Sequence, residues 1–264
     1  MHRWRRALIT GASAGIGREF ARQLASQGTD LVIVARREER LQQLARELES
    51  VVAVEVFVAN LADDADVERV VRRVQSETDP IDLLINNAAI GSSDTFVQTP
   101  IEGQLAAVDV NVTALVALSH AAARRMTAAG AGTILNMSSV AGNQPRGEHA
   151  VYAATKAFVT SFSQSLAIEL EGSGVGCTVV LPGLTTTEFH VANGIIENSP
   201  AVLWMRAEDV ATKALAAAST GRRLVIPGAL NKVTTVLATP RPGRVRDRAT
   251  RAVVSFVKRG SRRK

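Results

Sequence analysis

Runs of Val, Ile and Leu alternate along the chain with segments whose apolar residues recur at helical spacing. Residues 30–36, DLVIVAR, are almost continuously apolar, which is typical of a strand covered on both faces. In the next segment Leu41, Leu44 and Leu48 fall on one face of a predicted helix. The same reasoning predicts seven strands, at residues 5–10, 30–36, 51–60, 81–88, 132–139, 176–183 and 223–228. It predicts helices at residues 17–28, 37–50, 64–77 and 151–170.

Strands that alternate with helices of this length form parallel βαβ units. We therefore expect an α/β, Rossmann-type doubly wound fold, with an about seven-stranded parallel sheet and helices on both faces. No repeat or linker precedes Pro240, so residues 1–240 are expected to form one domain and residues 241–264 a C-terminal tail. In such sheets ligands bind outside the carboxyl ends of the strands. Short motifs follow the strands there, at residues 10–17, 35–37, 86–89, 138–142 and 182–187.

The composition is that of a packed soluble protein: 46% of the 264 residues are hydrophobic and the mean hydropathy is +0.09. No apolar run reaches the ~18 residues that a membrane span needs, and the apolar part of the opening residues is too short for the core of a signal peptide. The single cysteine, Cys177, excludes an internal disulfide and fits a reducing, cytoplasmic location. No His, Cys or Asp cluster has the spacing of metal ligands.

Positive charge is concentrated at the C-terminal end. Residues 241–264 contain ten Lys or Arg and one Asp, whereas residues 1–240 have a net charge of −3. The apolar residues of this tail recur at helical spacing, which predicts a basic amphipathic helix. Such a helix fits a peripheral contact with the inner membrane surface or with a partner groove, and it equally fits packing on its own domain. The acidic remainder argues against specific nucleic-acid binding.

A glycine-rich turn joins the first predicted strand to the first helix. It reads TGASAGIG, residues 10–17, and its three glycines permit a tight turn and close approach to a ligand. The free N–H groups and positive dipole at the start of the helix suit a pyrophosphate. The alternative is a tight strand–helix turn with no ligand.

Two arginines, Arg36 and Arg37, end the second strand, where many NAD sites have an acidic residue that binds the ribose 2′-hydroxyl. A guanidinium pairs instead with a 2′-phosphate. We therefore predict NADP(H) in preference to NAD(H). The alternative is a solvated pair of arginines beside Glu38 and Glu39.

The only tyrosine of the chain, Tyr152, is followed four residues later by Lys156. In a helix these two side chains lie on the same face. A free phenol has a pKa near ~10. We expect the ammonium group, and a cationic nicotinamide ring, to lower the pKa of Tyr152 enough for general acid–base chemistry. The alternative is a surface pair in which the phenol covers the lysine stem.

Together these motifs resemble the short-chain dehydrogenase/reductase family over about residues 5–228. The family's TGxxxGxG motif matches residues 10–17, its NNAG motif matches residues 86–89, and its YxxxK motif matches Tyr152 and Lys156. Its other landmarks are matched by Ser139, thirteen residues before the tyrosine, by the helix residue Asn111, and by Pro182 and Gly183 with Thr187. Each motif alone is weak, but six in one order are highly specific.

The resemblance implies an oxidoreductase that reduces a ketone or aldehyde with NADPH, or runs the reverse reaction. Tyr152 would exchange a proton with the substrate oxygen, Lys156 would lower the pKa of that phenol and hold the nicotinamide ribose, and Ser139 would donate a hydrogen bond to the carbonyl oxygen. Asn111 would anchor a water that links Lys156 to solvent, and Thr187 would orient the nicotinamide. The expected cofactor contacts are Gly11, Ser13, Ala14, Gly15, Ile16, Gly17, Arg36, Arg37, Asn60, Leu61, Asn87, Ala88, Ala89, Tyr152, Lys156, Pro182, Gly183 and Thr187. The resemblance also implies a homodimer or homotetramer.

Three features depart from the family's pattern: Ala89 replaces a glycine, Asn60 replaces an aspartate that meets the adenine, and the region beyond Gly228 does not follow the common ending. Apolar residues within 187–210 predict one wall of a pocket for a small hydrophobic carbonyl or alcohol substrate, although core packing of this segment is equally compatible. The candidate substrate contacts are Ser139, Tyr152, Phe189 and Trp204. His149 and His190 are expected to be polar loop residues.

Two other classes of function stay open. The chain could be a catalytically silent NADP(H)-binding scaffold or sensor, or an adaptor that works through its tail. The complete set of Ser139, Tyr152 and Lys156 argues against the first, and the acidic body argues against broad nucleic-acid binding by the second.

Overall fold

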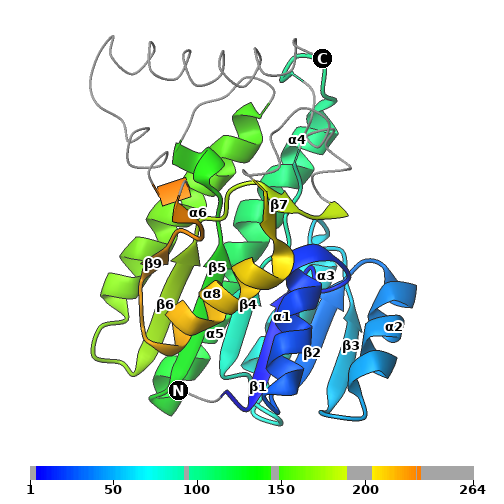
Figure 1. Cartoon of the computed structure of the whole chain (residues 1–264), viewed down its shortest axis with the longest axis vertical. Coiled ribbons are helices and arrows are strands. Elements are labelled where there is room, and N and C mark those ends of the chain that lie inside the picture. The colour runs from blue at the N-terminus through cyan, green and yellow to red at the C-terminus, as the bar shows by residue number, and fades with distance from the viewer. Residues whose placement is uncertain (1–3, 92–94, 144–148, 189–203, 230, 233–264) are drawn as a thin grey trace.

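A seven-stranded parallel sheet forms the centre of the molecule (Figure 1). The computed structural model describes residues 4–91, 95–143, 149–188, 204–229 and 231–232. Across the sheet the strands follow the order β3 (Val54–Val58), β2 (Asp30–Ala35), β1 (Arg6–Thr10), β4 (Leu83–Asn86), β5 (Gly132–Met137), β6 (Val175–Val180) and β9 (Leu224–Val225). Each predicted strand is present, and the predicted Rossmann-type fold is confirmed.

The strand order reverses between β1 and β4. Ile9 of β1 pairs in register with Ile33 of β2 on one side and with Ile85 of β4 on the other. The loops that follow β1 and β4 therefore lead to opposite halves of the sheet and leave a crevice at its carboxyl edge. A second, two-stranded parallel pair, β7 (Thr185–Thr186) with β8 (Met205–Arg206), follows β6 and was not predicted.

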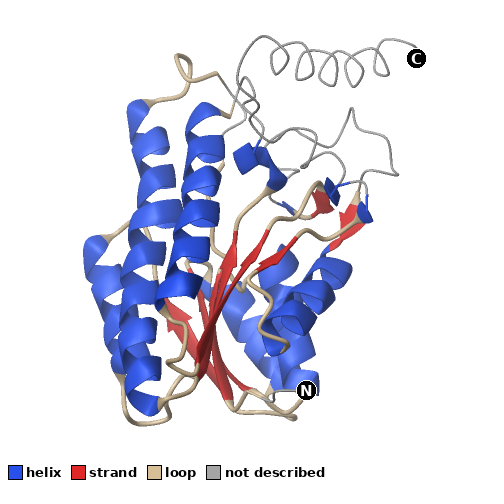
Figure 2. Cartoon of the chain, turned by 90° about the vertical axis from the view of Figure 1, so that its left-hand side faces the viewer, coloured by secondary structure: helices blue, strands red, loops and turns tan. Residues whose placement is uncertain are grey.

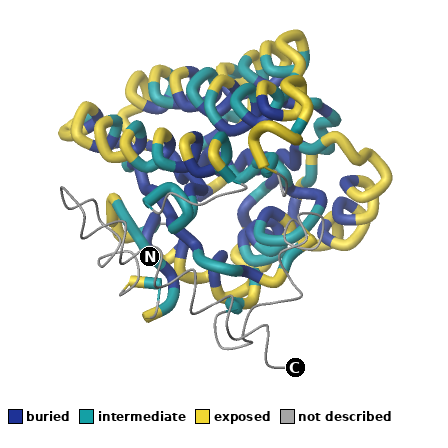
Figure 3. Tube along the Cα trace, turned by 90° about the horizontal axis from the view of Figure 1, so that it is seen from above, coloured by how far each residue is buried: buried dark blue, intermediate teal, exposed yellow. Residues whose placement is uncertain are grey.

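Helices cover both faces of the sheet (Figure 2). One layer contains α1 (Gly15–Ser26), α2 (Glu38–Leu48) and α8 (Ala207–Ser219), whose apolar faces share one buried cluster with the sheet. The other contains α3 (Asp64–Gln75), α5 (Leu115–Ala129) and α6 (Ala150–Glu169). Viewed from above, buried residues lie between the layers, and the exposed residues of the helices lie outside (Figure 3). The predicted apolar periodicity of these helices therefore marks the faces that meet the sheet.

One long helix runs from Ile101 to Ala129 and changes its winding on the way. It consists of α4 (Ile101–Val108), the π-helical turn η1 (Asp109–Ala114) and α5. Ile101 and Leu105 of α4 are exposed, whereas Leu115 and Leu118 of α5 are buried.

By length and composition this helix could cross a membrane, since its most apolar window has a mean hydropathy of 1.5. Half of that window is buried, and α5 packs against β4 and β5. No continuous apolar run long enough to span a membrane was found in the sequence analysis. The apolar character of this helix is that of a core helix.

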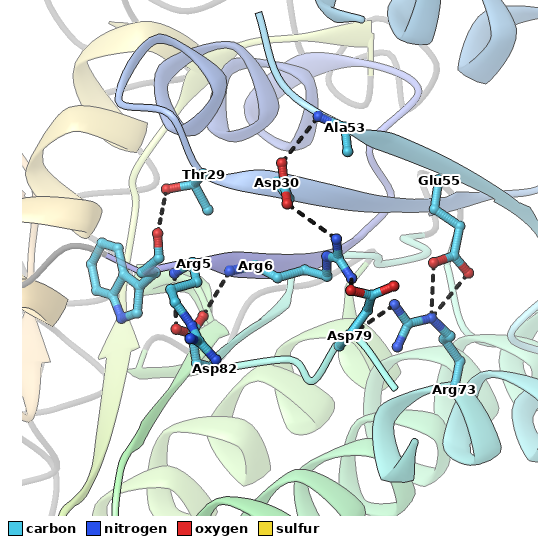
Figure 4. A network of polar contacts seen from close by, with 10 residues as sticks. Arg5, Arg6, Thr29, Asp30, Ala53, Glu55, Arg73, Asp79 and Asp82 are labelled. Carbon is cyan, nitrogen blue, oxygen red and sulfur yellow. Dashed lines mark hydrogen bonds and ion pairs between the residues drawn. The ribbon is translucent and has the colours of Figure 1, made fainter. Parts of the chain in front are cut away.

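A polar network fixes the amino end of β1 between its neighbours (Figure 4). Arg6 forms ion pairs with Asp30 at 3.1 Å and Asp79 at 2.9 Å. The Asp82 carboxylate accepts the backbone N–H groups of Arg5 and Arg6 at 2.8 and 3.0 Å. These contacts set the register of β1 at the edge of the sheet opposite the crevice.

Two groups of predictions fall outside the described residues. They are the basic helix of the tail at 241–264, and two residues of the expected pocket segment, the candidate substrate contact Phe189 and the polar loop residue His190. The proposed boundary at residue 240 lies there as well.

Candidate active site

A cleft of about 390 Å³ opens beside the switch between β1 and β4. Every predicted cofactor-contact residue except Gly17 lines it, together with the predicted catalytic residue Ser139. Sequence reasoning missed nine of its lining residues: Val34, Ala35, Ala59, Ile90, Val110, Met137, Ser138, Thr185 and Glu188. Most of these residues lie within or next to a motif named in the sequence analysis, and this proximity is the signal that could have identified them.

The glycine loop packs directly on the loop that follows β4. Gly11 and Gly15 have φ of +68° and +54°, which non-glycine residues rarely adopt. A Cβ on Gly11 would lie 2.9 Å from the Cα of Ala88. A Cβ on Gly17 would lie only 2.3 Å from the carbonyl oxygen of Gly11. Gly17 therefore permits α1 to pack against the loop and does not line the described cleft, so its contact with the cofactor stays a prediction.

Thr10 and Asn87 join the two loops into one unit. The Thr10 hydroxyl accepts the N–H groups of Asn87 and Ala88 at 2.9 and 3.0 Å. The Asn87 amide donates in return to the carbonyl oxygen of Thr10 at 2.9 Å. Helix α1 begins at Gly15 with no side-chain cap and no acidic residue in its first turn. Its N–H groups and dipole thus suit an anion at the floor of the cleft.

Arginines lie at the end of the cleft nearest β2. Arg37 donates to the Ser13 hydroxyl of the glycine loop at 3.0 Å and forms an ion pair with Glu188 at 2.9 Å. Arg40 pairs with the same Glu188 carboxylate at 2.6 Å, and the two arginines hold the pKa of Glu188 below its usual value. Arg36 lines the cleft and forms no ion pair with any described residue. The partner of Arg37 is therefore Glu188, from the loop after β6, and not Glu38 or Glu39.

Tyr152 and Lys156 converge on the opposite end of the cleft, one turn apart on α6. The Lys156 Nζ lies 5.7 Å from the centroid of the Tyr152 ring. It is almost fully buried and donates to the carbonyl oxygen of Met137 at 2.8 Å. The Ser139 hydroxyl forms a hydrogen bond with the Tyr152 phenol. The three side chains that were predicted to act together are brought together.

The pKa of Tyr152 differs in direction from the prediction. Burial raises it to about 12, although the hydrogen bond with Ser139 acts to lower it. Burial also lowers the pKa of Lys156 to about 8. In the protein chain itself, desolvation of the phenol has a larger effect on its pKa than the hydrogen bond with Ser139, because the phenolate loses its hydration when it is buried.

The strand end that carries Ser139 is pressed against α6. The Ser138 hydroxyl donates to the carbonyl oxygen of Lys156 at 2.7 Å. Ser139 leads into the short 3-10 helix η2 (Val140–Asn143), and its hydroxyl accepts the N–H of Ala141 at 3.1 Å. A Cβ on Gly142 would lie 2.7 Å from the backbone N of Ala157. Backbone packing thus fixes the distance between Ser139 and the helix that carries Tyr152.

Asn111 lies in the π-helical turn η1, behind the cleft lining. Its amide accepts the N–H of Ile90 at 2.8 Å and donates to the Ile90 carbonyl oxygen at 2.9 Å. It also donates to the Thr155 hydroxyl at 3.0 Å, which bonds the carbonyl oxygen of Tyr152. The side chain therefore joins the loop after β4 to the first turn of α6. A water relay through Asn111 stays a prediction.

The substrate side of the cleft is only partly described. Trp204 is half-buried just before β8 and does not line the described cleft. The ring of His149, at the N-cap of α6, lies edge-on to Tyr152 with 6.4 Å between centroids. Within the described ranges no group of three His, Cys, Asp or Glu could hold a metal ion.

Comparisons with known proteins agree with this geometry. A family model described as "short chain dehydrogenase" matches residues 5–194. Sulfoacetaldehyde reductase 2 of Chromohalobacter salexigens is 38% identical over 184 residues, which cover 69% of this chain and 73% of that protein.

Two solved structures extend the likeness over nearly the whole chain. A short-chain dehydrogenase from Sphingobium yanoikuyae in complex with NADPH is 38% identical, has a TM-score of 0.80, and is matched over 92% of this chain and 99% of its own. The bulky-bulky ketone specific alcohol dehydrogenase from Comamonas testosteroni is 33% identical with a TM-score of 0.79, over 96% and 95% of the two chains.

Proposed function

Because the chain belongs to the short-chain dehydrogenase/reductase family, we propose that it reduces a ketone or aldehyde with NADPH, or catalyses the reverse oxidation, with Tyr152 as the general acid or base. It is an oxidoreductase of alcohol and carbonyl groups, and it uses a nicotinamide cofactor. The observation that carries the proposal is the convergence of Tyr152, Ser139 and Lys156 on the cleft that the glycine loop also lines.

The cleft residues fit a dinucleotide. The uncapped start of α1 and the left-handed glycines suit its pyrophosphate, and the buried ammonium of Lys156 suits the ribose hydroxyls. Thr187 lies close to the glycine loop, since a Cβ added to Gly15 would lie 3.0 Å from the Cγ2 atom of Thr187. We assign Thr187 to the nicotinamide amide. When bound, NADPH supplies the hydride.

The protein's own task is then to place and protonate the carbonyl oxygen. A phenol with a pKa raised to about 12 stays protonated at neutral pH, so Tyr152 is ready to donate in the reductive direction. Ser139 adds a second donor where negative charge grows on that oxygen. The positive charge of Lys156 stabilises the phenolate that proton donation leaves behind. The reverse oxidation requires that phenolate at the outset and is favoured by high pH.

The preference for NADP(H) rests on the arginines. β2 ends at Ala35, and Arg36 and Arg37 follow it, with no acidic residue at the position that binds a 2′-hydroxyl. Both arginines are among the residues that line the cleft. A direct comparison of NADPH and NADH dissociation constants tests this assignment, and tighter binding of NADH would refute it.

A hydrophobic carbonyl compound is the proposed substrate class. Ile90, Val110 and Met137 give the cleft an apolar wall, and the ketone specificity named for the Comamonas relative points in the same direction.

The proposed homo-oligomer is supported by the apolar side chains exposed on α4 and α6. These are Ile101, Leu105, Phe158 and Ile168.

A screen of ketones and aldehydes for NADPH consumption tests the activity. Tyr152→Phe should lose nearly all turnover and keep its affinity for NADPH, because the ring and its packing remain. Ser139→Ala should also lose most turnover. Turnover by Tyr152→Phe equal to that of the unmodified protein would contradict the assignment.

Liposome sedimentation of the full chain and of residues 1–240 tests the separate proposal of a membrane-binding tail.

A further inference from the structure

One carboxylate spans the mouth of the cleft at the end where we place the 2′-phosphate. Glu188 lies two residues after the end of β7 and directly follows Thr187. Its oxygens contact guanidinium nitrogens of Arg37 at 2.9 Å and of Arg40 at 2.6 Å. A segment that belongs to the β6 side of the sheet is therefore bound to the start of α2, on the β2 side.

Arg37 would keep its position without Glu188. Its guanidinium also donates to the Ser13 hydroxyl through Nε at 3.3 Å and through Nη2 at 3.0 Å. Ser13 belongs to the glycine loop, and both residues line the cleft. The serine therefore orients the guanidinium toward the ligand space, whereas Glu188 neutralises it.

Charge decides what can replace Glu188. A guanidinium pairs with a carboxylate or with a phosphate through the same two-pronged geometry, and a phosphate carries more negative charge. The 2′-hydroxyl of NAD(H) carries none. Only the phosphorylated cofactor brings a group that can take the place of the carboxylate on Arg37.

From these contacts, and on the premise of the proposed function, we propose that Glu188 is a cofactor-specificity residue that competes with the 2′-phosphate of NADP(H) for Arg37. Phosphate binding breaks the contact between Glu188 and Arg37, and NAD(H) binding leaves it in place. The carboxylate therefore sets the affinity for NADP(H) below the value that the arginines alone would give.

The effect should be modest, because Glu188, Arg37 and Arg40 are each about half exposed. Ion pairs with this degree of exposure are worth up to about a fivefold change in an equilibrium constant. Glu188→Gln keeps the size of the side chain and removes its charge. Glu171→Gln is the matched control, since Glu171 is equally exposed, pairs with Arg223 and does not line the cleft.

The test uses the full chain and two adenosine fragments that need no turnover, adenosine 2′,5′-bisphosphate and AMP, with calorimetry as the readout. Glu188→Gln should bind the bisphosphate about three- to fivefold more tightly and AMP unchanged, and Glu171→Gln should match the unmodified protein for both. Unchanged or weaker binding of the bisphosphate by Glu188→Gln would overturn the role of Glu188 and leave the NADP(H) preference standing. If the unmodified protein binds the two fragments equally, the preference itself fails, and the role of Glu188 with it. Equal melting temperatures of the variants confirm that each is folded.

Discussion

The ammonium group of Lys156 donates a 2.8 Å hydrogen bond to the carbonyl oxygen of Met137, the last residue of β5. The lysine therefore enters the core from α6 and ends against the sheet, where only 3% of the residue is exposed. Burial removes the ammonium group from water, and this desolvation lowers the pKa of Lys156 to about 8. This one contact has consequences for both activity and stability.

Carbonyl reduction should lose efficiency just above neutral pH. Above a pKa of about 8 the free enzyme loses the positive charge on Lys156, whereas Tyr152, with a pKa of about 12, stays protonated. We expect kcat/KM for NADPH to be level below pH 7, to fall about twofold by pH 8, and above pH 9 to fall about tenfold for each pH unit. A pH profile from 6.5 to 10 at constant ionic strength measures this. A profile that stays level to pH 10 would show that Lys156 keeps an ordinary pKa.

Replacing Lys156 should stabilise the protein while it abolishes turnover. The pKa of Lys156 is about 8 in the folded chain and 10.5 ordinarily, so burying the charged form costs about 3 kcal/mol, at 1.4 kcal/mol for each pH unit. Lys156→Met removes this cost but leaves the Met137 carbonyl oxygen without its donor, a loss of about 1–2 kcal/mol. Urea unfolding at pH 7 should therefore show Lys156→Met to be more stable by about 1–2 kcal/mol.

The same change gives a pH signature that a simple packing effect would lack. Between pH 8 and 10 the unfolded unmodified chain binds more protons at Lys156 than the folded chain does, so its stability rises with pH in this window. The advantage of Lys156→Met should shrink over the same range. A constant difference from pH 7 to pH 10 would argue that the pKa of Lys156 is not lowered by folding.

Substitution by alanine should have opposite effects on the stability of the protein at two glycines, Gly17 and Gly103. A Cβ on Gly17 would lie 2.3 Å from the Gly11 carbonyl oxygen, and backbone on both sides leaves little room to relax. Gly17→Ala should therefore cost about 3 kcal/mol of stability and strongly weaken NADPH binding. On Gly103, in α4, a Cβ would meet nothing closer than Thr99 Cγ2 at 3.7 Å. Gly103→Ala should stabilise by about 0.5–1 kcal/mol, and thermal unfolding with NADPH titration compares the two.

Asn111 should affect turnover through its positioning of the loop after β4 and of α6. Asn111→Ala leaves the N–H and carbonyl oxygen of Ile90 without their partners and frees the first turn of α6. We expect a loss of about 2 kcal/mol of stability and a lower kcat with little change in the NADPH dissociation constant. Thr155→Val, which removes only one of the Asn111 contacts, should show a smaller loss of both. A normal kcat in Asn111→Ala would refute the positioning role.

The apolar runs predicted the strands because a parallel sheet buried on both faces needs continuous Val, Ile and Leu. The two-residue strands β7 and β8 have no such run, so their pairing was beyond a sequence pattern. Most motif residues line one cleft because the parallel fold brings the carboxyl ends of the strands to one edge of the sheet.

What sequence missed depends on long-range packing. The contact between Arg37 and Glu188 joins residues 151 positions apart, and no local sequence pattern predicts it. The pKa of Tyr152 was expected to fall because its neighbour in sequence is a cation, yet burial by distant elements raises it. The close approach of Gly17 to the Gly11 carbonyl oxygen is likewise a packing relationship that the motif alone does not give.

The wide turn η1 fixes the place of Asn111 opposite Ile90. A π-helical turn accommodates one residue more than an α-helical turn. Loss of a single residue between Asp109 and Ala114 would therefore let the turn close into an ordinary α-helical turn, and Asn111 would lose the position from which it bonds the N–H and carbonyl oxygen of Ile90. In this family member, the length of that short segment is constrained more strictly than its composition, and natural variation there should appear as substitutions and not as deletions.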